Sequence, residues 1–266
     1  MSTDDDGRFE LAKAIAIEGG NLAVNMREAQ RDGFRQRMGH QDFVTAADLA
    51  VEELVRRRIQ ERFPEDSVLG EEQGISGSRD SVWIVDPIDG TTNYMRGMPE
   101  CAVSIVYCKG GSLGFGAIYA PDIATLGAAR KGQGATLNTA VARVSGCDRE
   151  QDALVLLGRS DREGGGRYVN CIKAVLAHGM EYRRNGSAAY SLLAVAAGRA
   201  EAYYEAHLNP WDVAAGLVII EEASGKVRHP SLVEFLAKGG PVLASNAPLH
   251  DKIASIIDRV TELRIH

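Results

Sequence analysis

The chain has 266 residues, of which 45% are hydrophobic and 25% charged, a composition that excludes a disordered protein. The formal net charge of -6 argues against non-specific binding to nucleic acid, which usually requires a basic surface, but bound cations would still let an acidic pocket accept an anionic substrate. The N-terminus lacks the pattern of a secretory signal, and no apolar run is long enough to span a bilayer, so we expect a cytoplasmic protein.

The first half of the sequence predicts two helices followed by a run of short strands. Apolar residues at near-helical spacing predict a helix over 9–31 and a second one after Thr45 that stops near Phe63. Further on, short β-rich runs separated by turn residues predict an antiparallel meander with one face packed against the helices. The predicted strands of this meander are 82–85, 102–107, 113–119 and 125–129.

The second half alternates between short strands and helices, which predicts layered packing of the two. The predicted strands are 154–157, 181–183, 200–205 and 242–245. The predicted helices are 167–178, 188–197, 211–223 and 251–263. The change in character near 146–152 divides the chain into an N-terminal half, 1–147, and a C-terminal half, 148–266.

The strongest local signal is the segment 83–93, which reads WIVDPIDGTTN. A buried apolar strand leads into Asp86 and Asp89, and Pro87 restrains the turn so that the two carboxylates can share one small space. Like charges this close repel unless cations are shared between them, and Mg²⁺ suits such hard oxygen ligands. Free amides after Gly90, at an expected helix start, would bind a phosphate oxygen. The alternative is an Asp-rich turn with local hydrogen bonds only.

Two further acidic segments could join this site. Glu71 and Glu72 follow a short apolar run and Gly70, although such pairs are usually solvated surface. Asp212 stands in the first turn of an apolar helix, where it could equally serve as an ordinary cap. Together the three segments offer four acids at the ends of elements, a set that two-metal phosphate chemistry could use.

In order and spacing, the segments 70–72 (GEE), 86–93 (DPIDGTTN) and 211–216 (WDVAAG) resemble the inositol monophosphatase family. The resemblance extends from the first helix to about Gly225. It implies an α+β fold, a layered αβαβα sandwich in two tightly packed halves with the active site between them. It also implies a Mg²⁺-dependent, lithium-sensitive homodimer that hydrolyses a small phosphate monoester, with myo-inositol 1-phosphate as the leading substrate.

The resemblance assigns roles to residues of this chain. The implied metal ligands are Glu71, Asp86, the main-chain carbonyl of Ile88, Asp89 and Asp212. A metal-bound water would be the nucleophile, oriented by Glu71 and Thr91. Asp48 would support Thr91 in catalysis, although it fits equally well as a capping acid for the helix that follows Thr45. The implied substrate and phosphate contacts are Asp89, Gly90, Thr91, Arg183 or its neighbour Arg184, Gly186, Ser187, Ala188, Glu205 and Asp212.

Two departures from the family pattern bear on the substrate. Arg37 stands where family members often carry Lys, which keeps the charge but changes its geometry. Arg159 lies in a segment that differs from the small turn of animal members. If it faces the pocket it favours a more anionic substrate, and if it faces solvent it carries no information.

Two alternative functions stay open. Related phosphatases act on histidinol phosphate, a 3',5'-bisphosphate nucleotide, fructose 1,6-bisphosphate or NADP. A protein of another class would keep the fold and regulate by contacting RNA or transcription machinery, and it would need an exposed basic face. The arginine-containing runs 27–37, 56–58 and 183–184 are the candidates for that face, although such a run is more often a solvated helix surface.

Overall fold

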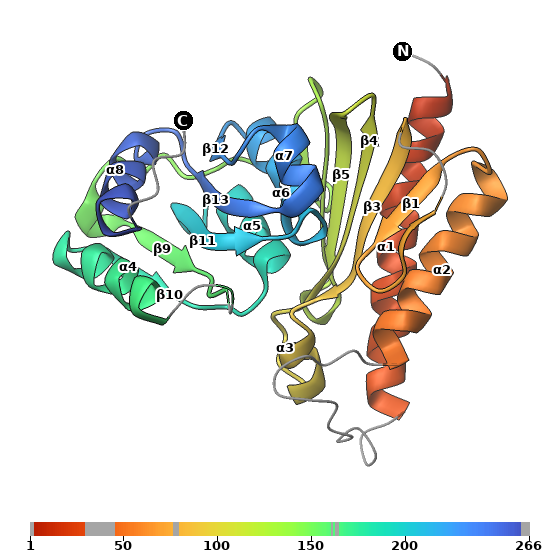
Figure 1. Ribbon diagram of the computed structural model, residues 1–266, viewed down its shortest axis with the longest axis horizontal. Helices are drawn as coiled ribbons and strands as arrows, with labels where there is room; N and C mark the ends of the chain where they lie inside the picture. Colours follow the sequence, from red (N-terminus) through yellow and green to blue (C-terminus); the bar gives the residue numbers. More distant parts are fainter. Residues whose placement is uncertain (1–2, 30–45, 77–79, 161, 163–164, 262–266) are drawn as a thin grey trace.

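The computed structural model describes residues 3–29, 46–76, 80–160, 162 and 165–261. These residues form five layers in the order helices, sheet, helices, sheet, helices, as Figure 1 shows. The predicted layered αβαβα sandwich is therefore confirmed. The helices are α1 (Thr3–Ala29), α2 (Ala46–Arg62), α3 (Thr91–Arg96), α4 (Gly165–Ala177), α5 (Ala188–Ala196), α6 (Pro210–Glu222), α7 (Leu232–Lys238) and α8 (His250–Thr261).

The first sheet runs in the order β2-β1-β3-β4-β5-β6-β7-β8. Its pairs are antiparallel except β1 with β3, and the long strands β3 to β6 are the predicted meander. The four additional strands are only two to four residues long, too short to leave a pattern. The bounds are β1 (Ser67–Gly70), β2 (Gly74–Ser76), β3 (Ser81–Asp89), β4 (Ala102–Lys109), β5 (Ser112–Ala120), β6 (Thr125–Arg130), β7 (Ala135–Leu137) and β8 (Ala140–Val141).

Helices cover both faces of this sheet: α1 and α2 pack on one face, as predicted, and α5 and α6 pack on the other. Along β3, Val82 and Ile84 join the core formed with α5 and α6, whereas Trp83 and Val85 join the core formed with α1 and α2. Successive side chains of a strand point to opposite faces, and a continuous apolar run is what a strand buried on both sides requires.

The second sheet runs in the order β10-β9-β11-β13-β12. The first three strands are parallel, and β13 is antiparallel to both β11 and β12. The strand β12 and the helix α7 were not predicted from the sequence, because both are short. The division proposed at 147/148 falls between β8 and β9. The bounds are β9 (Leu154–Leu157), β10 (Glu181–Arg183), β11 (Ala202–Leu208), β12 (Lys226–Arg228) and β13 (Gly240–Ser245).

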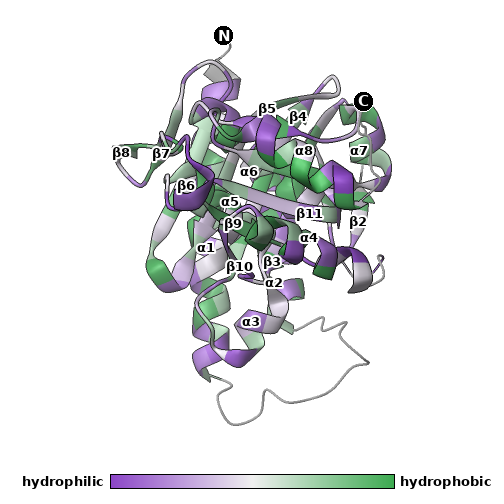
Figure 2. Ribbon diagram, turned by 90° about the vertical axis from the view of Figure 1, so that its left-hand side faces the viewer, coloured by the Kyte–Doolittle hydropathy of each residue, from purple (hydrophilic) through white to green (hydrophobic). Residues whose placement is uncertain are grey.

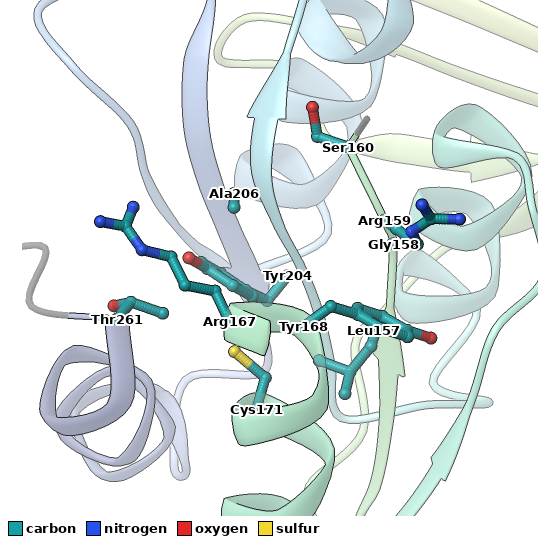
Figure 3. A pocket seen from close by; sticks show the side chains of 10 residues that line it. All are labelled: Leu157, Gly158, Arg159, Ser160, Arg167, Tyr168, Cys171, Tyr204, Ala206 and Thr261. Atoms are coloured by element: carbon teal, nitrogen blue, oxygen red, sulfur yellow. The ribbon is translucent and has the colours of Figure 1, made fainter. Parts of the chain in front are cut away.

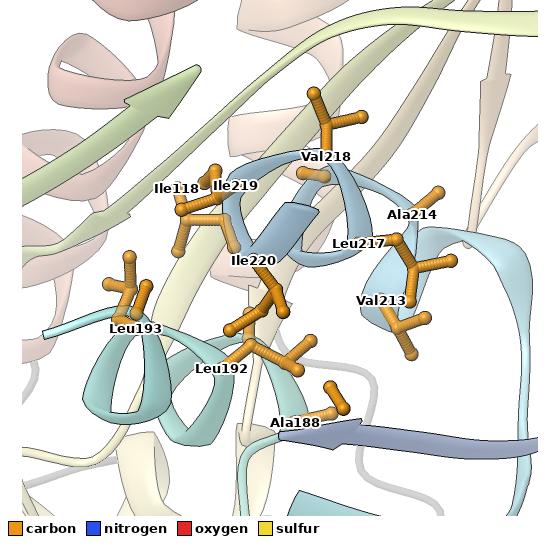
Figure 4. Packing of buried hydrophobic residues seen from close by; sticks show 14 of the residues in the cluster. Ile118, Ala188, Leu192, Leu193, Val213, Ala214, Leu217, Val218, Ile219 and Ile220 are labelled. Atoms are coloured by element: carbon orange, nitrogen blue, oxygen red, sulfur yellow. The ribbon is translucent and has the colours of Figure 1, made fainter. Parts of the chain in front are cut away.

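The middle layer of α5 and α6 meets the first sheet at glycines. A Cβ atom at Gly116 of β5 would lie 2.7 Å from the carbonyl oxygen of Ala215 in α6, and one at Gly127 of β6 would lie 2.2 Å from a methyl carbon of Leu193 in α5. Figure 4 shows the apolar side chains of α5 and α6 packed together there, with Ile219 beside Ile118 of β5. The two halves therefore approach each other as closely as their backbones allow.

Hydrophobic character follows this layering. In Figure 2 the green, hydrophobic segments concentrate on the inner elements α5 and α6. Among the helices that the structure describes, none combines the length and apolar character needed to cross a membrane. The four cysteines are free thiols; Cys101, Cys108 and Cys171 are buried, and Cys147 is half-buried.

Candidate active site

A bulge at the end of β3 brings Asp86 and Asp89 together. The strand does not end at Val85, as predicted, but continues to Asp89. In a regular strand, residues three apart point to opposite faces. Here Asp86 pairs with Ser104 and Asp89 with Ala102, so three steps along β3 match two along β4. The extra residue turns both carboxylates toward the same space, where Asp89 contributes to raising the pKa of Asp86.

Five carboxyl groups from four different elements or turns meet at this point, and we call them the acidic cluster: Asp48, Glu71, Asp86, Asp89 and Asp212. Burial is the largest cause that raises the pKa of Asp86 and Asp212 well above its ordinary value, and neighbouring carboxylates add to it. Burial, followed by the charges of neighbouring acids, raises the pKa of Glu71 from 4.5 to about 8. The cluster thus concentrates negative charge that the protein compensates only in part.

Asp86 is the least compensated member of the acidic cluster. Its side chain is buried, and its Oδ1 atom has no hydrogen-bond partner among the described residues. A buried carboxylate oxygen without a donor is costly, and a hard divalent cation is the partner that would satisfy it. In the part of the chain that the structure describes, no group of three or more His, Cys, Asp or Glu side chains could hold a metal ion in its present arrangement. The chemistry of the donors nevertheless suits such a cation.

Asp89 is held by the N-terminus of α5. Its carboxylate accepts hydrogen bonds from the Ser187 hydroxyl and from the Ala189 amide, the latter at 2.6 Å. Burial raises the pKa of Asp89 to about 6, and these hydrogen bonds oppose the rise because they favour the charged form. Ser187 also caps α5, since its hydroxyl accepts the Tyr190 amide. One serine therefore fixes both a helix start and a carboxylate of the acidic cluster.

Asp212 caps α6 and also lies close enough to the other acids to affect Asp86. In the first turn of α6, its Oδ2 atom accepts the amide of Asn209 at 2.7 Å, which is a capping interaction. Its charge also raises the pKa of Asp86. Asp48 lies buried in the first turn of α2, and its charge raises the pKa of Glu71. Thr45, the expected partner in a capping box, lies outside the described residues.

The turn after β3 approaches its neighbours closely and starts α3, as expected. Gly90 has a φ of 87°, and a Cβ atom there would lie 2.8 Å from the carbonyl oxygen of Glu100. Only glycine fits this position without strain. The Thr91 hydroxyl donates to the carbonyl oxygen of Ile88 at 3.1 Å. That carbonyl is the implied main-chain metal ligand, so Thr91 and the proposed ligand are in direct contact.

Asn93 links this turn to the opposite wall of the site. Its buried side-chain amide donates to the carbonyl oxygens of Glu100 and Asn185, each at 2.7 Å. A Cβ atom at Gly186, which has a φ of 79°, would lie 3.1 Å from the same amide nitrogen. Sequence reasoning gave Asn93 no structural role, because its partner Asn185 is 92 residues away.

A pocket with a cavity volume of about 180 Å³ opens beside the acidic cluster. Asp89 and Asp212 lie at its acidic end, Glu205 lies on the wall formed by β11, and Arg159 and Arg184 lie at its rim. The predicted segment 186–188 also lines it.

Glu205 is fixed in this pocket by two neighbours. Its carboxylate is buried and accepts the hydroxyl of Tyr203 at 2.6 Å. It also packs directly on Gly158, where a Cβ atom would lie 1.9 Å from the Glu205 Oε2 atom. The segment around Gly158 departs from the family pattern, and this contact explains its glycine. Arg159, the next residue, is exposed but does line the pocket.

The two candidate arginines point to different places. Arg183 is exposed and donates to Glu181 at 2.9 Å and to the Tyr182 carbonyl at 2.7 Å, outside the pocket. Arg184 lines the pocket. The geometry therefore favours Arg184 over Arg183 as the substrate contact. Arg37 lies outside the described residues.

A second, more apolar pocket adjoins the first and shares Leu157, Gly158 and Arg159 with it. Figure 3 shows Arg159 and Arg167 on opposite sides of this pocket, with Cys171 and Tyr204 between them. No carboxylate stands among its lining residues. It therefore lacks the oxygen ligands that a divalent cation needs, and the pocket beside the acidic cluster is the candidate site.

Comparison with known proteins agrees with this geometry. The model of the inositol monophosphatase family matches residues 6–262, well past Gly225. A protein of Aquifex aeolicus named fructose-1,6-bisphosphatase/inositol-1-monophosphatase is 35% identical over 262 residues, 97% of each chain. A protein of Xylella fastidiosa named Nus factor SuhB is 37% identical over 188 residues, 70% of this chain and 68% of its own. The crystal structure of inositol monophosphatase from Anabaena superposes with a TM-score of 0.84 at 32% identity, covering 98% of this chain and 99% of that one. The chain therefore belongs to the inositol monophosphatase family.

Proposed function

We propose that the protein is a Mg²⁺-dependent phosphatase of small phosphate monoesters, with myo-inositol 1-phosphate as its leading substrate. The observation that carries this proposal is the acidic cluster beside a pocket that Asp89 and Asp212 line, with an oxygen of Asp86 that has no hydrogen-bond partner among the described residues. Membership of the family supports the reaction class.

The proposed ligands of Mg²⁺ are Glu71, Asp86, the carbonyl oxygen of Ile88, Asp89 and Asp212. Cations bound by such a set lower the pKa of a water molecule, neutralise phosphoryl oxygens and stabilise the departing alkoxide. The protein's own contribution is to hold these oxygens together at a point where burial alone would favour their protonation.

Thr91 and Glu71 are the proposed residues that orient and deprotonate the attacking water. The Thr91 hydroxyl donates a hydrogen bond to the carbonyl oxygen of Ile88. The oxygen of Thr91 therefore stays available to accept a hydrogen bond from that water. Glu71 supplies a carboxylate that can accept the proton. The amides of Gly90 and Thr91 are proposed to bind a phosphate oxygen at the start of α3. Asp48 is proposed to support Thr91 from the first turn of α2.

The pocket walls provide the proposed contacts for the rest of the substrate. Asp89, Glu205 and the turn 186–188 can accept or donate hydrogen bonds to sugar or inositol hydroxyls. Tyr203 already donates to Glu205, so one oxygen of that carboxylate is oriented before substrate binds. This preorganisation favours a polyhydroxylated leaving group over an apolar one.

The test is a panel of phosphate monoesters assayed with purified protein, with and without Mg²⁺ and with added Li⁺. We expect Mg²⁺-dependent release of phosphate from myo-inositol 1-phosphate and inhibition by Li⁺. No hydrolysis of any ester would contradict the reaction class. A preference of roughly a hundredfold for histidinol phosphate would contradict only the substrate, because pocket contacts set such ratios.

The two arginines favour a second candidate substrate with another anionic group. Arg159 and Arg184 both line the pocket, and arginine is the usual partner of a second phosphate. The Aquifex relative is named for fructose 1,6-bisphosphate as well as inositol phosphate. The panel should therefore include fructose 1,6-bisphosphate, a 3',5'-bisphosphate nucleotide and NADP.

A regulatory role beside RNA or transcription machinery ranks below these enzymatic functions. The name of the Xylella relative is the reason to test it. Against it, Arg56 and Arg58 pair with Glu52 and Glu18, and Arg183 pairs with Glu181, so their charge is partly neutralised. The variant Asp89→Asn separates the functions. Loss of phosphatase activity with partner binding intact would show two functions, and unchanged phosphatase activity would contradict the proposed metal site.

The proposed setting is a cytoplasmic homodimer. Free cysteines are compatible with a reducing compartment, and the dimer is an expectation from the family. Light scattering on the purified protein measures the assembly directly, and a monomeric mass at micromolar concentration would contradict it.

A further inference from the structure

One face of α2 is built toward the turn that carries Glu71. Asp48, Glu52 and Arg56 are spaced four residues apart, so they lie in one row along the helix. Glu52 is fully buried, with 0% of its surface exposed. A buried carboxylate in an acidic neighbourhood is costly, and the proposed metal ligands do not include it, so its position calls for another explanation.

Glu52 receives two consecutive backbone amides of that turn. Its Oε2 atom accepts the Glu72 amide at 2.9 Å, and its Oε1 atom accepts the Gln73 amide at 3.1 Å. The carboxylate also packs on Gly70, where a Cβ atom would lie 2.3 Å from the Glu52 carboxyl carbon. The glycine before Glu71 is therefore required by the approach of Glu52.

Arg56 holds both ends of the same turn. It donates to the Glu52 carboxylate at 2.8 Å, to the Val68 carbonyl in β1 at 3.1 Å, and to the Gly74 carbonyl at the start of β2 at 2.5 Å. The ion pair of Glu52 and Arg56 therefore holds the turn 71–73 on both sides. Glu52 accepts hydrogen bonds from amides of the turn, and Arg56 donates to backbone carbonyls before and after it. By contrast, the hydrogen bond that the Glu71 amide donates to the carbonyl oxygen of Val85 is longer, at 3.3 Å.

We propose that Glu52 and Arg56 form a positioning pair that fixes the turn 71–73 and thereby aims the Glu71 carboxylate at the acidic cluster. The inference that this aim serves metal binding and turnover rests on the proposed function. Glutamine at position 52 would offer one acceptor oxygen and one NH₂ group to two amide donors. The turn would then lose one of its two fixed amides while the helix stays intact.

The test compares Glu52→Gln with Glu53→Gln, and Arg56→Lys with Arg57→Lys, because Glu53 and Arg57 are the exposed neighbours on α2. In metal-free protein, hydrogen exchange is measured for a peptide covering 67–76. Mg²⁺ binding is measured by titration calorimetry, and kcat and KM are measured with the best substrate. We expect faster exchange in both site variants and a loss of roughly 10- to 100-fold in Mg²⁺ affinity and kcat, as for other partners of ligating residues. KM should change by less than about threefold. The controls should match wild type.

The outcomes separate this inference from the proposed function. A folded Glu52→Gln protein with exchange, Mg²⁺ affinity and kcat equal to those of Glu53→Gln would overturn the positioning pair. If Glu52→Gln does not fold, Arg56→Lys decides by the same measurements, because lysine keeps the charge but cannot reach both carbonyls at once. If the wild type hydrolyses no ester but the site variants still speed exchange in the turn and weaken Mg²⁺ binding, the positioning pair stands and the phosphatase proposal fails.

Discussion

The two halves of the chain, which form the two walls of the acidic cluster, differ in how many hydrogen-bond donors they supply to its carboxylates. On the wall from the first half, the Oδ1 atom of Asp86 lacks a donor among the described residues. On the wall from the second half, the helix starts of α5 and α6 supply donors, so Asp89 binds Ser187 and Ala189, and Asp212 binds Asn209. One half concentrates charge and the other partly compensates it. The uncompensated remainder is what a cation would neutralise.

Removing the uncompensated charge should have the largest effect. Asp86→Asn should lower kcat/KM by about 10³-fold or more, because a neutral amide is a poor ligand for a hard cation. Without divalent cations the same variant should be more stable than wild type at a pH high enough to ionise Asp86, since the amide carries no charge to bury. Each kcal/mol gained would raise Tm by roughly 2–4 °C in a chain of this size. Steady-state kinetics and thermal unfolding measure the two changes.

The control for Asp86→Asn is Asp251→Asn, at an exposed position on α8. It should change neither quantity. Normal turnover by the Asp86→Asn protein would contradict the proposed role of Asp86 as a metal ligand.

The next largest effect is the dependence of stability on pH in cation-free protein. The pKa of Glu71 rises from 4.5 to about 8 and that of Asp89 from 3.8 to about 6 on folding, so the folded state binds protons more tightly than the unfolded state. Their contribution to stability is complete below the unfolded pKa values and is lost as pH rises through about 8. Urea unfolding from pH 4.5 to 9 in EDTA should therefore show falling stability.

Added Mg²⁺ should flatten this fall, because it neutralises the ionised carboxylates. The Asp86→Asn variant in EDTA should also show a shallower fall. Equal slopes with and without Mg²⁺ would mean that no cation is held by these groups.

A smaller effect tests the donor wall. Ser187→Ala removes the hydroxyl that caps α5 and donates to Asp89, so we expect a loss of about 1 kcal/mol in unfolding free energy together with a fall of roughly tenfold in kcat/KM. Ser231→Ala is the matched control, since Ser231 caps α7 through the amide of Glu234. It should lose similar stability and no activity. Equal activity in the two variants would contradict the role of Ser187.

The smallest effect concerns the substrate. Arg184→Ala should lower kcat/KM for fructose 1,6-bisphosphate by roughly five- to tenfold and leave myo-inositol 1-phosphate nearly unchanged, because only the bisphosphate has a second anionic group to lose a partner. Arg183→Ala, one residue away but outside the pocket, should leave both substrates unchanged. The reverse result would restore Arg183 as the substrate contact.

The long elements and the acidic segments could be predicted from the sequence, because periodicity and the sequence of turns are local signals. The bulge between Asp86 and Asp89 could not, since it exists only in the pairing of β3 with β4. The role of Asn93 could not be predicted either, because it depends on a carbonyl 92 residues away. Which of Arg183 and Arg184 lines the pocket depends on the direction of the backbone after β10, and two adjacent arginines give no local signal of that direction.

The glycines between the first sheet and the middle helices have a consequence for redesign of the enzyme. Gly116 lets α6, which carries Asp212, pack closely on the first sheet, and Gly127 does the same for α5. A larger side chain at either glycine would push the helix away from the sheet and widen the gap between carboxylates that are proposed to share an ion, although both glycines lie in the sheet interface rather than in the pocket. Laboratory evolution toward new substrates should therefore vary the residues at the pocket rim and keep Gly116 and Gly127 unchanged.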